Sequence, residues 1–307
     1  MTEQSKSDRL RAAVALALAE GLGYGARLSR ALRQLGPDLP DGDVATAVVF
    51  DGLSEQRRGT ATVESALERL RAYEARGVQV IPLGSRPYPW RLAECRGAPA
   101  LLFTRGDHQR LAALRCAAVV GTRRASDAGM RSAHATAAEL VRLGYAVVSG
   151  LALGIDTAAH EGALGESGTT IAVLAGSVEH VYPRANAALA ERIVSDGGVL
   201  VSEYPPDAPT SRGGFVARNR IQAGLSECVI AIEAGEGSGT MHTVRFARDY
   251  GRPVLCPSAA RLGLHGAGLT ELVQEEGCVL YESGGLADAV TESLAQGGHV
   301  GEPGTLF

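Results

Sequence analysis

From about residue 115 onward, short apolar runs alternate with stretches of helical periodicity, and this alternation constrains the fold more than any other feature of the sequence. Apolar runs typical of buried strands lie at 116–120, 145–148, 170–174, 198–202, 228–233, 253–256 and 278–281. Helices are predicted between and after them, at 127–143, 156–166, 185–196, 216–225, 239–250, 267–276 and 285–295. Strands that alternate with helices form right-handed crossovers, so successive strands run parallel. The sequence therefore predicts an α/β fold, with a mostly parallel sheet covered by helices on both faces.

The first hundred residues follow a different pattern. Helical periodicity covers 8–20, 26–35 and 62–76, with proline and glycine between these segments. We expect a small helical domain over residues 1–77, followed by an extended Rossmann-like domain over 78–296. This second domain is predicted to open with a strand at 78–81, a proline-rich turn at 87–90 and an apolar run at 98–104. The glycine-rich tail, 297–307, is expected to be flexible.

Composition excludes several classes of protein. Lys6 is the single lysine among 30 basic residues, so no glycine-rich loop carries the lysine that a P-loop ATPase needs. No apolar run reaches the length of about 18 residues that spans a bilayer, so we expect no contact with a membrane. The five cysteines are far apart and form no C-x-x-C metal motif, and three of them (116, 228 and 256) fall in predicted buried strands. Together these features favour a reducing, cytoplasmic location.

Residues that follow the predicted strands indicate a site for an anion. In an open parallel sheet, the loops after the strands all emerge at the carboxyl edge, where ligands bind. Glycine there lets a ligand approach the backbone, and the helices that follow present N–H groups and a positive dipole end. The residues in these loops and at the starts of the following helices are Gly121, Thr122, Arg123, Ser149, Gly150, Arg212, Phe215, Arg218, Asn219, Arg220, Ser238 and Gly239.

The charge pattern supports this site although the formal net charge is −4. Acidic residues are missing between Asp107 and Asp127 and again between Asp207 and Glu227, and both windows contain several arginines. Net charge is a poor guide when charges are segregated in this way. We therefore expect an electropositive pocket at one rim of the sheet.

The residues alone leave the identity of the anion open. The dinucleotide fingerprint G-x-G-x-x-G is not met after Gly235, and no G-x-S-x-G or H-E-x-x-H motif is present. Asp156 and His160 lie one helical turn apart, a spacing more typical of an interaction at a helix start than of a catalytic pair. Phe215, between arginines, suits either the stacking of a base or ordinary packing at a helix start. We expect no cofactor and no bound metal.

Several longer segments resemble one family. Its members share the motifs V-x-x-V-G-[ST]-R-x-x-S, S-G-L-A-x-G-I-D-x-x-A-H, T-x-A-V-L-x-x-G…Y-P, F-P-x-R-N-R-I-x-A-G-L-S and E-x-x-x-x-S-G-[ST]. The matching segments here are 117–126 (AAVVGTRRAS), 149–160 (SGLALGIDTAAH), 170–183 (TIAVLAGSVEHVYP), 215–226 (FVARNRIQAGLS) and 233–240 (EAGEGSGT). In order and spacing the chain resembles the DNA-processing protein A (DprA/Smf) family from about Gln79 to Pro257.

This resemblance implies a function. Members bind single-stranded DNA without sequence preference, protect incoming DNA and load the RecA recombinase onto it during natural transformation and recombination. They act as homodimers in the cytoplasm and have no known catalytic activity, and longer members begin with a SAM-like helical domain. By motif position, Arg123 would bind phosphate, Arg212 would contact DNA and Phe215 would lie near the bases. The other residues implied in DNA binding are Gly121, Thr122, Ser149, Gly150, Arg218, Asn219, Arg220, Ser238 and Gly239.

Two residues depart from the family pattern at this site. Leu153 stands where the family usually has arginine, so one expected cation is missing. Val216 replaces a usual proline.

One enzyme remains as the alternative. Nucleoside-monophosphate phosphoribohydrolases of the lysine-decarboxylase-like family share a Rossmann-like fold and a loop of the form G-G-x-G-T-x-x-E, whose glutamate is catalytic. In this chain, Gly237–Thr240 is followed by Met241, His242 and Thr243, so that glutamate is absent. The binding protein is therefore favoured over the enzyme.

Overall fold

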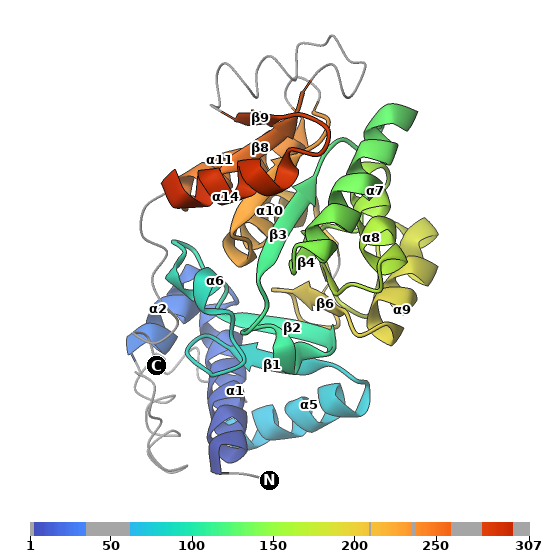
Figure 1. Ribbon diagram of the computed structural model, residues 1–307. Helices are drawn as coiled ribbons and strands as arrows, with labels where there is room; N and C mark the ends of the chain where they lie inside the picture. The colour runs from blue at the N-terminus through green and yellow to red at the C-terminus, as the bar shows by residue number, and fades with distance from the viewer. Residues whose placement is uncertain (1–2, 35–61, 209, 235–237, 259–277, 297–307) are drawn as a thin grey trace.

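A computed structural model describes residues 3–34, 62–208, 210–234, 238–258 and 278–296 (Figure 1). Over these residues the chain builds a nine-stranded sheet in the order β1-β2-β6-β5-β4-β3-β7-β8-β9. The strands β3 to β9 pair in parallel, whereas β1 pairs antiparallel to β2 and β2 antiparallel to β6. The strand bounds are β1 Gln79–Pro82, β2 Leu101–Gly106, β3 Cys116–Val120, β4 Ala146–Ser149, β5 Thr170–Val173, β6 Val199–Ser202, β7 Cys228–Ala231, β8 Val254–Pro257 and β9 Val279–Tyr281.

Helices connect the parallel strands from β3 to β8 as the sequence pattern predicts. The α-helices are α1 Glu3–Leu22, α2 Ala26–Gln34, α5 Val63–Ala75, α6 Trp90–Glu94, α7 Asp127–Arg142, α8 Ile155–Gly165, α9 Ala187–Ser195, α10 Arg212–Leu225, α11 Gly239–Asp249 and α14 Leu286–Gln296, with 3₁₀ turns η1 His108–Arg110 and η2 Arg184–Asn186. The predicted α/β, Rossmann-like, mostly parallel sheet is confirmed. The helix predicted at 267–276 and the tail at 297–307 lie outside the described residues.

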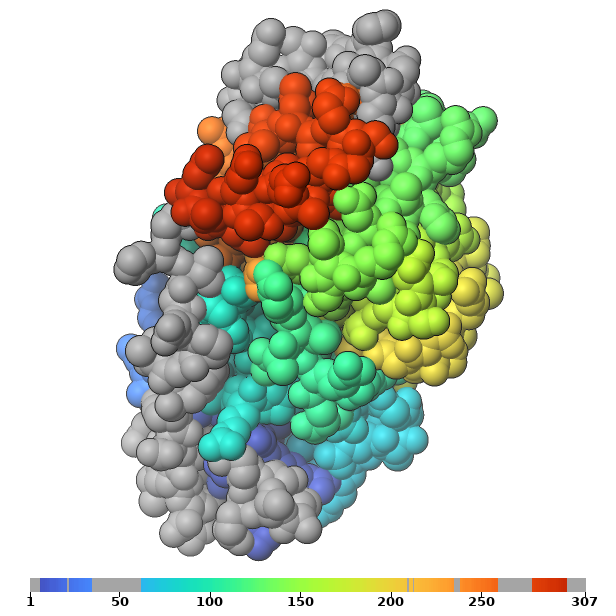
Figure 2. Space-filling view, in the orientation of Figure 1, coloured from blue at the N-terminus to red at the C-terminus, as the bar shows by residue number. Residues whose placement is uncertain are grey.

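The central strands bury alternate residues on opposite faces of the sheet. In β3, Ala118 and Val120 join one hydrophobic cluster, whereas Ala117 and Val119 join the other. Side chains alternate across a strand, so two clusters mean that both faces are covered. The helices α7, α8 and α14 supply apolar residues to the cluster of Ala117 and Val119, and α10 and α11 supply them to the opposite one. In Figure 2, the red segment that carries α14 lies against green α7 at the surface of the molecule.

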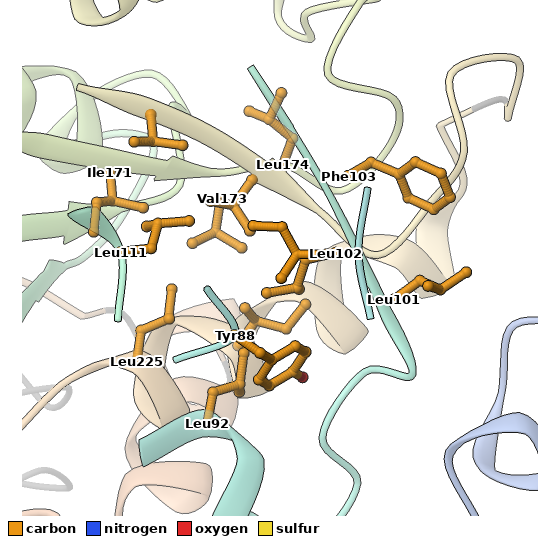
Figure 3. Packing of buried hydrophobic residues seen from close by; sticks show 14 of the residues in the cluster. Tyr88, Leu92, Leu101, Leu102, Phe103, Leu111, Ile171, Val173, Leu174 and Leu225 are labelled. Carbon is orange, nitrogen blue, oxygen red and sulfur yellow. The ribbon is translucent and has the colours of Figure 1, made fainter. Parts of the chain in front are cut away.

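The larger core cluster extends from the sheet to α6. Figure 3 shows Tyr88 and Leu92 packed close to Leu225 of α10, with side chains of β2 and β5 completing the cluster. Tyr88 is fully buried, and its hydroxyl donates to the carbonyl of Pro99 at 2.7 Å. Fully burying an apolar side chain of this size contributes roughly 1.5–3 kcal/mol. This packing fixes α10, which carries several residues of the predicted site.

The N-terminal helices lie against the antiparallel edge of the sheet. α1 and α5 both contact β1, and buried residues of α1, α2 and α5 belong to the same cluster as Phe103 of β2 (Figure 1). The division of the chain into domains at 1–77, 78–296 and 297–307 stays a prediction. Among the described helices, none combines the length and the apolarity that crossing a membrane requires.

Candidate anion-binding site

A cavity of about 360 Å³, lined by both polar and apolar residues, opens at the carboxyl ends of β3 and β7. The chain runs from β3 outward through β4, β5 and β6, and then crosses to the other side of β3 to form β7. Such a change of direction leaves a crevice between the two loops, and ligands of α/β proteins bind there. We call the cavity the switch-point pocket; its walls are Val120–Arg123, Ala152, Asp156, Phe215, Val216, Arg218, Asn219, Gln222, Ser238–Thr240 and Thr243.

Arg123 and Phe215 form one wall of the switch-point pocket. Arg123 is exposed in the loop after β3, and its guanidinium lies over the Phe215 ring at 4.6 Å from the centroid. The attraction between a cation and the negative face of a ring is worth about 0.5–1 kcal/mol at an exposed site. The contact leaves Arg123 without a carboxylate partner among the described residues. Because the guanidinium is exposed, its positive charge would attract an anion that enters the pocket.

Arg218 lies beneath this wall and is buried. Its guanidinium is 3.7 Å from a carboxylate oxygen of Asp156, and it donates to the carbonyl of Val173 at 3.2 Å. Both partners are at least nine-tenths buried, so loss of water raises the pKa of Asp156 and lowers the pKa of Arg218. Because Asp156 compensates its charge, Arg218 adds less positive potential to the pocket than the exposed Arg123 does.

Gly150 makes room for this buried pair. A Cβ atom at residue 150 would collide with the guanidinium of Arg218. Residue 150 must therefore be glycine because the Arg218 side chain lies against its backbone, whether or not a ligand also approaches there.

The start of α11 supplies the second wall. Ser238 is the N-cap residue of α11, but its hydroxyl makes no capping hydrogen bond and is buried without a partner. The first N–H groups of a helix have no partner within the helix and carry a partial positive charge. Asn219 positions this helix start, since its side-chain amide donates to the carbonyl of Gly239 at 3.0 Å.

Further hydrogen-bonding atoms on the walls also lack partners. Nε2 of Gln222 and Nε of Arg218 are buried without a hydrogen bond, as is the Ser238 hydroxyl. Gln222 is only 1% exposed. Native proteins pair most buried polar atoms with protein, water or ligand, so these three atoms are positions where a water or a polar ligand can supply a partner.

The start of α7 is closed to ligands, unlike that of α11. Ser126 caps α7 by accepting from the N–H of Gly129 at 3.0 Å. The carboxylate of Glu233, two residues beyond β7, accepts from both the N–H and the hydroxyl of Ser126 at 3.1 Å. Of the two helix starts, α7 and α11, the start of α11 therefore fits better the expectation that backbone N–H groups at this edge bind the anion.

The structure brings together most of the predicted site residues. Gly121, Thr122, Arg123, Phe215, Arg218, Asn219, Ser238 and Gly239 all line the switch-point pocket. Arg220 lies elsewhere: its guanidinium pairs with Glu203 through two hydrogen bonds and donates to the carbonyl of Gly97 at 2.9 Å. Ser149 is buried and donates to the carbonyl of Val119 at 2.7 Å. The side chain of Arg212 lies outside the described residues.

Sequence reasoning missed Gln222, Thr240 and Thr243. All three line the pocket from helices, whereas the prediction considered mainly the loops after the strands. Gln222 stands four residues after Arg218, and Thr243 three residues after Thr240. Residues at these spacings share a helix face, which is the signal that identifies them.

His160 takes no part in this pocket. It is fully buried, and its Nδ1 lies 2.7 Å from the hydroxyl of Thr170. Burial and the nearby charge of Arg218 lower its pKa to about 3, so the ring is neutral near pH 7. No hydrogen bond joins it to Asp156, which is also a described residue. The geometry thus agrees with the sequence in disfavouring a catalytic pair.

The chemistry of the pocket suits a phosphate group beside a flat ring. Arg123 and the start of α11 attract negative charge, the amide nitrogen of Gln222 has no hydrogen-bond partner, and Phe215 offers an aromatic surface. Across the described residues, acids, histidines and cysteines form no group with the makings of a metal site.

Comparison with known proteins gives consistent matches. The family model of DNA recombination-mediator protein A matches residues 79–291. The DNA processing protein DprA of Bacillus subtilis is 34% identical over 227 residues, which cover 74% of this chain and 76% of that protein.

Solved structures agree with these matches. The structure of DNA processing protein A from Streptococcus pneumoniae aligns with a TM-score of 0.63 at 30% identity, covering 92% of this chain and 95% of that one. The Helicobacter pylori protein, described for its unique single-stranded DNA binding mode, aligns with a TM-score of 0.60 at 26% identity and covers 71% of this chain and 96% of that one. With the family model matched over most of the sheet and the strand-end loops, the chain belongs to the DNA recombination-mediator protein A family.

Proposed function

We propose that this protein binds single-stranded DNA without sequence preference, through the switch-point pocket. The observation that carries the proposal is the position of exposed Arg123 on the ring of Phe215, opposite the uncapped start of α11. A single strand presents phosphates and unstacked bases in alternation, and this pocket offers a partner for each. The Helicobacter pylori DNA processing protein A, whose structure aligns with this chain, binds single-stranded DNA, and this supports the proposal.

In this proposal, Arg123, the hydroxyl of Thr122 and the backbone of Gly121 and Gly239 hold a phosphate, while Phe215 lies near a base; the N–H of Thr122 is already donated to the carbonyl of Glu233. The remaining proposed DNA-binding residues are Ser149, Gly150, Arg212, Arg218, Asn219, Arg220 and Ser238. Of these, Arg218 and Ser149 act from buried positions by fixing the pocket walls, and Arg220 acts by holding α10 on Glu203.

We further propose that the protein protects incoming DNA and loads RecA recombinase onto it during natural transformation and recombination. We infer that it does so as a homodimer in the cytoplasm. Membership of the recombination-mediator family supports the mediator role. All five cysteines are buried free thiols, which suits a reducing compartment.

A salt titration of binding to an oligo-dT tests the central proposal. The logarithm of affinity is expected to fall linearly with the logarithm of salt concentration, by about 0.7 for each phosphate neutralised. Arg123→Ala should weaken binding at low salt and reduce the steepness of this line by about 0.7, the value for one phosphate contact. Arg142→Ala is the matched control, because Arg142 is an exposed arginine at the far end of α7, roughly 20 Å along the helix axis from its start. Equal binding by the two variants would contradict a phosphate site at Arg123.

We propose that the pocket performs no catalysis. The glutamate needed by phosphoribohydrolases is absent, and His160 is turned away from the pocket onto Thr170. Incubation with AMP should release no adenine above the level of a protein-free control. Release of adenine that Arg123→Ala abolishes would establish the enzyme instead.

A further inference from the structure

Exposed apolar side chains gather at the mouth of the switch-point pocket. Over the described residues, six large hydrophobic side chains are more than a third exposed. Three of the six, Leu153, Tyr182 and Val216, belong to segments that border the pocket, and Tyr182 is the most exposed of all at 56%. Apolar groups concentrated beside a cavity mark a binding surface more often than a chance arrangement does.

Tyr182 lies next to Phe215 on the side away from the switch-point pocket. The two ring centroids are 5.8 Å apart, and the ring planes meet at 66°, an edge-to-face arrangement. Around them lies a small second cavity of about 70 Å³, which we call the aromatic recess; its walls are Arg123, Gly150, Ala152, Leu153, Tyr182, Pro183 and Phe215. An edge-to-face contact occupies one edge of a ring only, so the exposed ring of Tyr182 keeps surface for another flat group.

The aromatic recess and the switch-point pocket are adjoining parts of one site. Arg123, Ala152 and Phe215 line both of them. The two parts differ in chemistry, since one offers a cation and hydrogen-bond donors while the other is built from Leu153, Tyr182 and Pro183. A ligand that fills both must carry a negative charge next to an apolar, flat group.

We propose that the aromatic recess is a nucleobase subsite, in which Tyr182 stacks on the base next to the phosphate held at Arg123. This inference rests on the proposed single-stranded DNA binding and gives a role to Tyr182, which stands in the family motif matched at 170–183 but was assigned no role from it. The Leu153 side chain packs against the edge of the same base. A base needs no hydrogen-bond partner to stack, so the subsite accepts any of the four bases, in agreement with binding that ignores sequence.

The shared arginine favours a nucleobase over an apolar protein segment as the occupant. A hydrophobic peptide would cover the exposed guanidinium of Arg123 without supplying an anion, and an unpaired buried charge is costly. A nucleotide supplies the phosphate and the ring together. The recess is also small, at about 70 Å³, which leaves little room for a folded partner.

Paired oligonucleotides separate this proposal from the one on which it rests. Affinity is measured for an oligo-dT and for an abasic strand of the same length, which keeps every phosphate and removes every base. Tyr182→Ala should weaken binding of the oligo-dT about five-fold or more, because stacking contributes roughly 1–3 kcal/mol per base. It should leave binding of the abasic strand unchanged. Tyr182→Phe keeps the ring and should bind both strands as the unaltered protein does.

A fluorescent reporter gives an independent reading of the same contact. Trp90 is the one tryptophan of the chain, so Trp90→Phe with Tyr182→Trp places the only indole in the recess. Its emission should be quenched by the oligo-dT and little affected by the abasic strand.

The outcomes are distinct. Equal weakening of both strands by Tyr182→Ala, or full oligo-dT affinity together with unquenched emission, overturns the nucleobase subsite while leaving the phosphate site intact. Failure of the unaltered protein to bind either strand overturns the proposed function itself.

Discussion

The guanidinium of Arg123 rests on the ring of Phe215, and this contact joins the loop after β3 to the first turn of α10. The two residues lie 92 positions apart in the sequence (215 minus 123). They hold a cation and an aromatic face together before any ligand arrives, so little side-chain entropy remains to be lost on binding. This preorganised pair leads to the first of four predictions.

Phe215→Leu is expected to weaken binding of an oligo-dT by about 1–3 kcal/mol, because the side chain stays apolar but loses the flat face on which a base stacks. Fluorescence anisotropy at fixed salt measures the change. Val279→Ala alters an equally exposed valine on β9 that lines neither cavity, and serves as the control. A Phe215→Leu variant with unchanged affinity would show that Phe215 has only a packing role.

Asp156→Asn is expected to destabilise the fold by about 3–5 kcal/mol, since it leaves the buried guanidinium of Arg218 without its compensating charge. Urea unfolding measures the loss. Glu161→Gln is the matched control on the same helix, where the carboxylate is exposed, and should change stability by no more than about 0.5 kcal/mol. Equal stability of the two variants would mean that Arg218 finds other compensation.

Gly150→Ala is expected to destabilise the protein by about 1–3 kcal/mol, because the added methyl group meets the guanidinium of Arg218 and forces it to move. It should weaken binding of the oligo-dT as well, since the displaced side chain lies under the pocket. Gly213→Ala is the control, as a Cβ there meets no atom within 4 Å. The result that contradicts the prediction is a Gly150→Ala protein as stable as the Gly213→Ala protein.

His160 should make the fold less stable as the pH falls. Its pKa is lowered from 6.5 to about 3 by burial, so the unfolded chain binds a proton that the folded chain refuses. The stability that the neutral ring contributes is full above pH 6.5 and is lost progressively as the pH falls toward 3. Between pH 6.5 and 5 the loss is about 2 kcal/mol, at roughly 1.4 kcal/mol for each pH unit.

Urea unfolding at pH 7 and pH 5 checks this expectation when His160→Gln is compared with the unaltered protein. The variant should lose less stability between the two pH values. His180→Gln changes an exposed histidine and should keep the full dependence. An identical pH dependence in all three proteins would rule out His160 as its source.

The sheet could be predicted closely because its parallel strands are short apolar runs. The predicted strand at 116–120 coincides with β3, and the one at 198–202 differs from β6 by one residue. Each of these strands is buried on both faces, so its pattern is an unbroken apolar run rather than an alternation. The apolar run alone was sufficient to locate each strand, because the surrounding sheet buries both of its faces.

The site was harder to predict because its residues depend on partners distant in sequence. Arg218 and Arg220 were expected to act together, yet residues two apart on a helix face in nearly opposite directions. Arg218 accordingly turns inward to Asp156, and Arg220 turns to Glu203. Periodicity indicated the divergence but could not name either partner. Tyr182 stands in the family motif matched at 170–183 but was assigned no role, because it lies in an irregular turn, where no repeating pattern reports which side chains are exposed.

Glu233 follows the last residues of β7, close to the rim where an anion would enter, and a negative charge there would repel it. The carboxylate is instead held at the start of α7, where it accepts hydrogen bonds from the N–H and the hydroxyl of Ser126. The position of the Glu233 carboxylate near this rim thus depends on Ser126, which does not line the pocket. Loss of the Ser126 hydroxyl would remove one of these two donors and leave the carboxylate held by the Ser126 N–H alone.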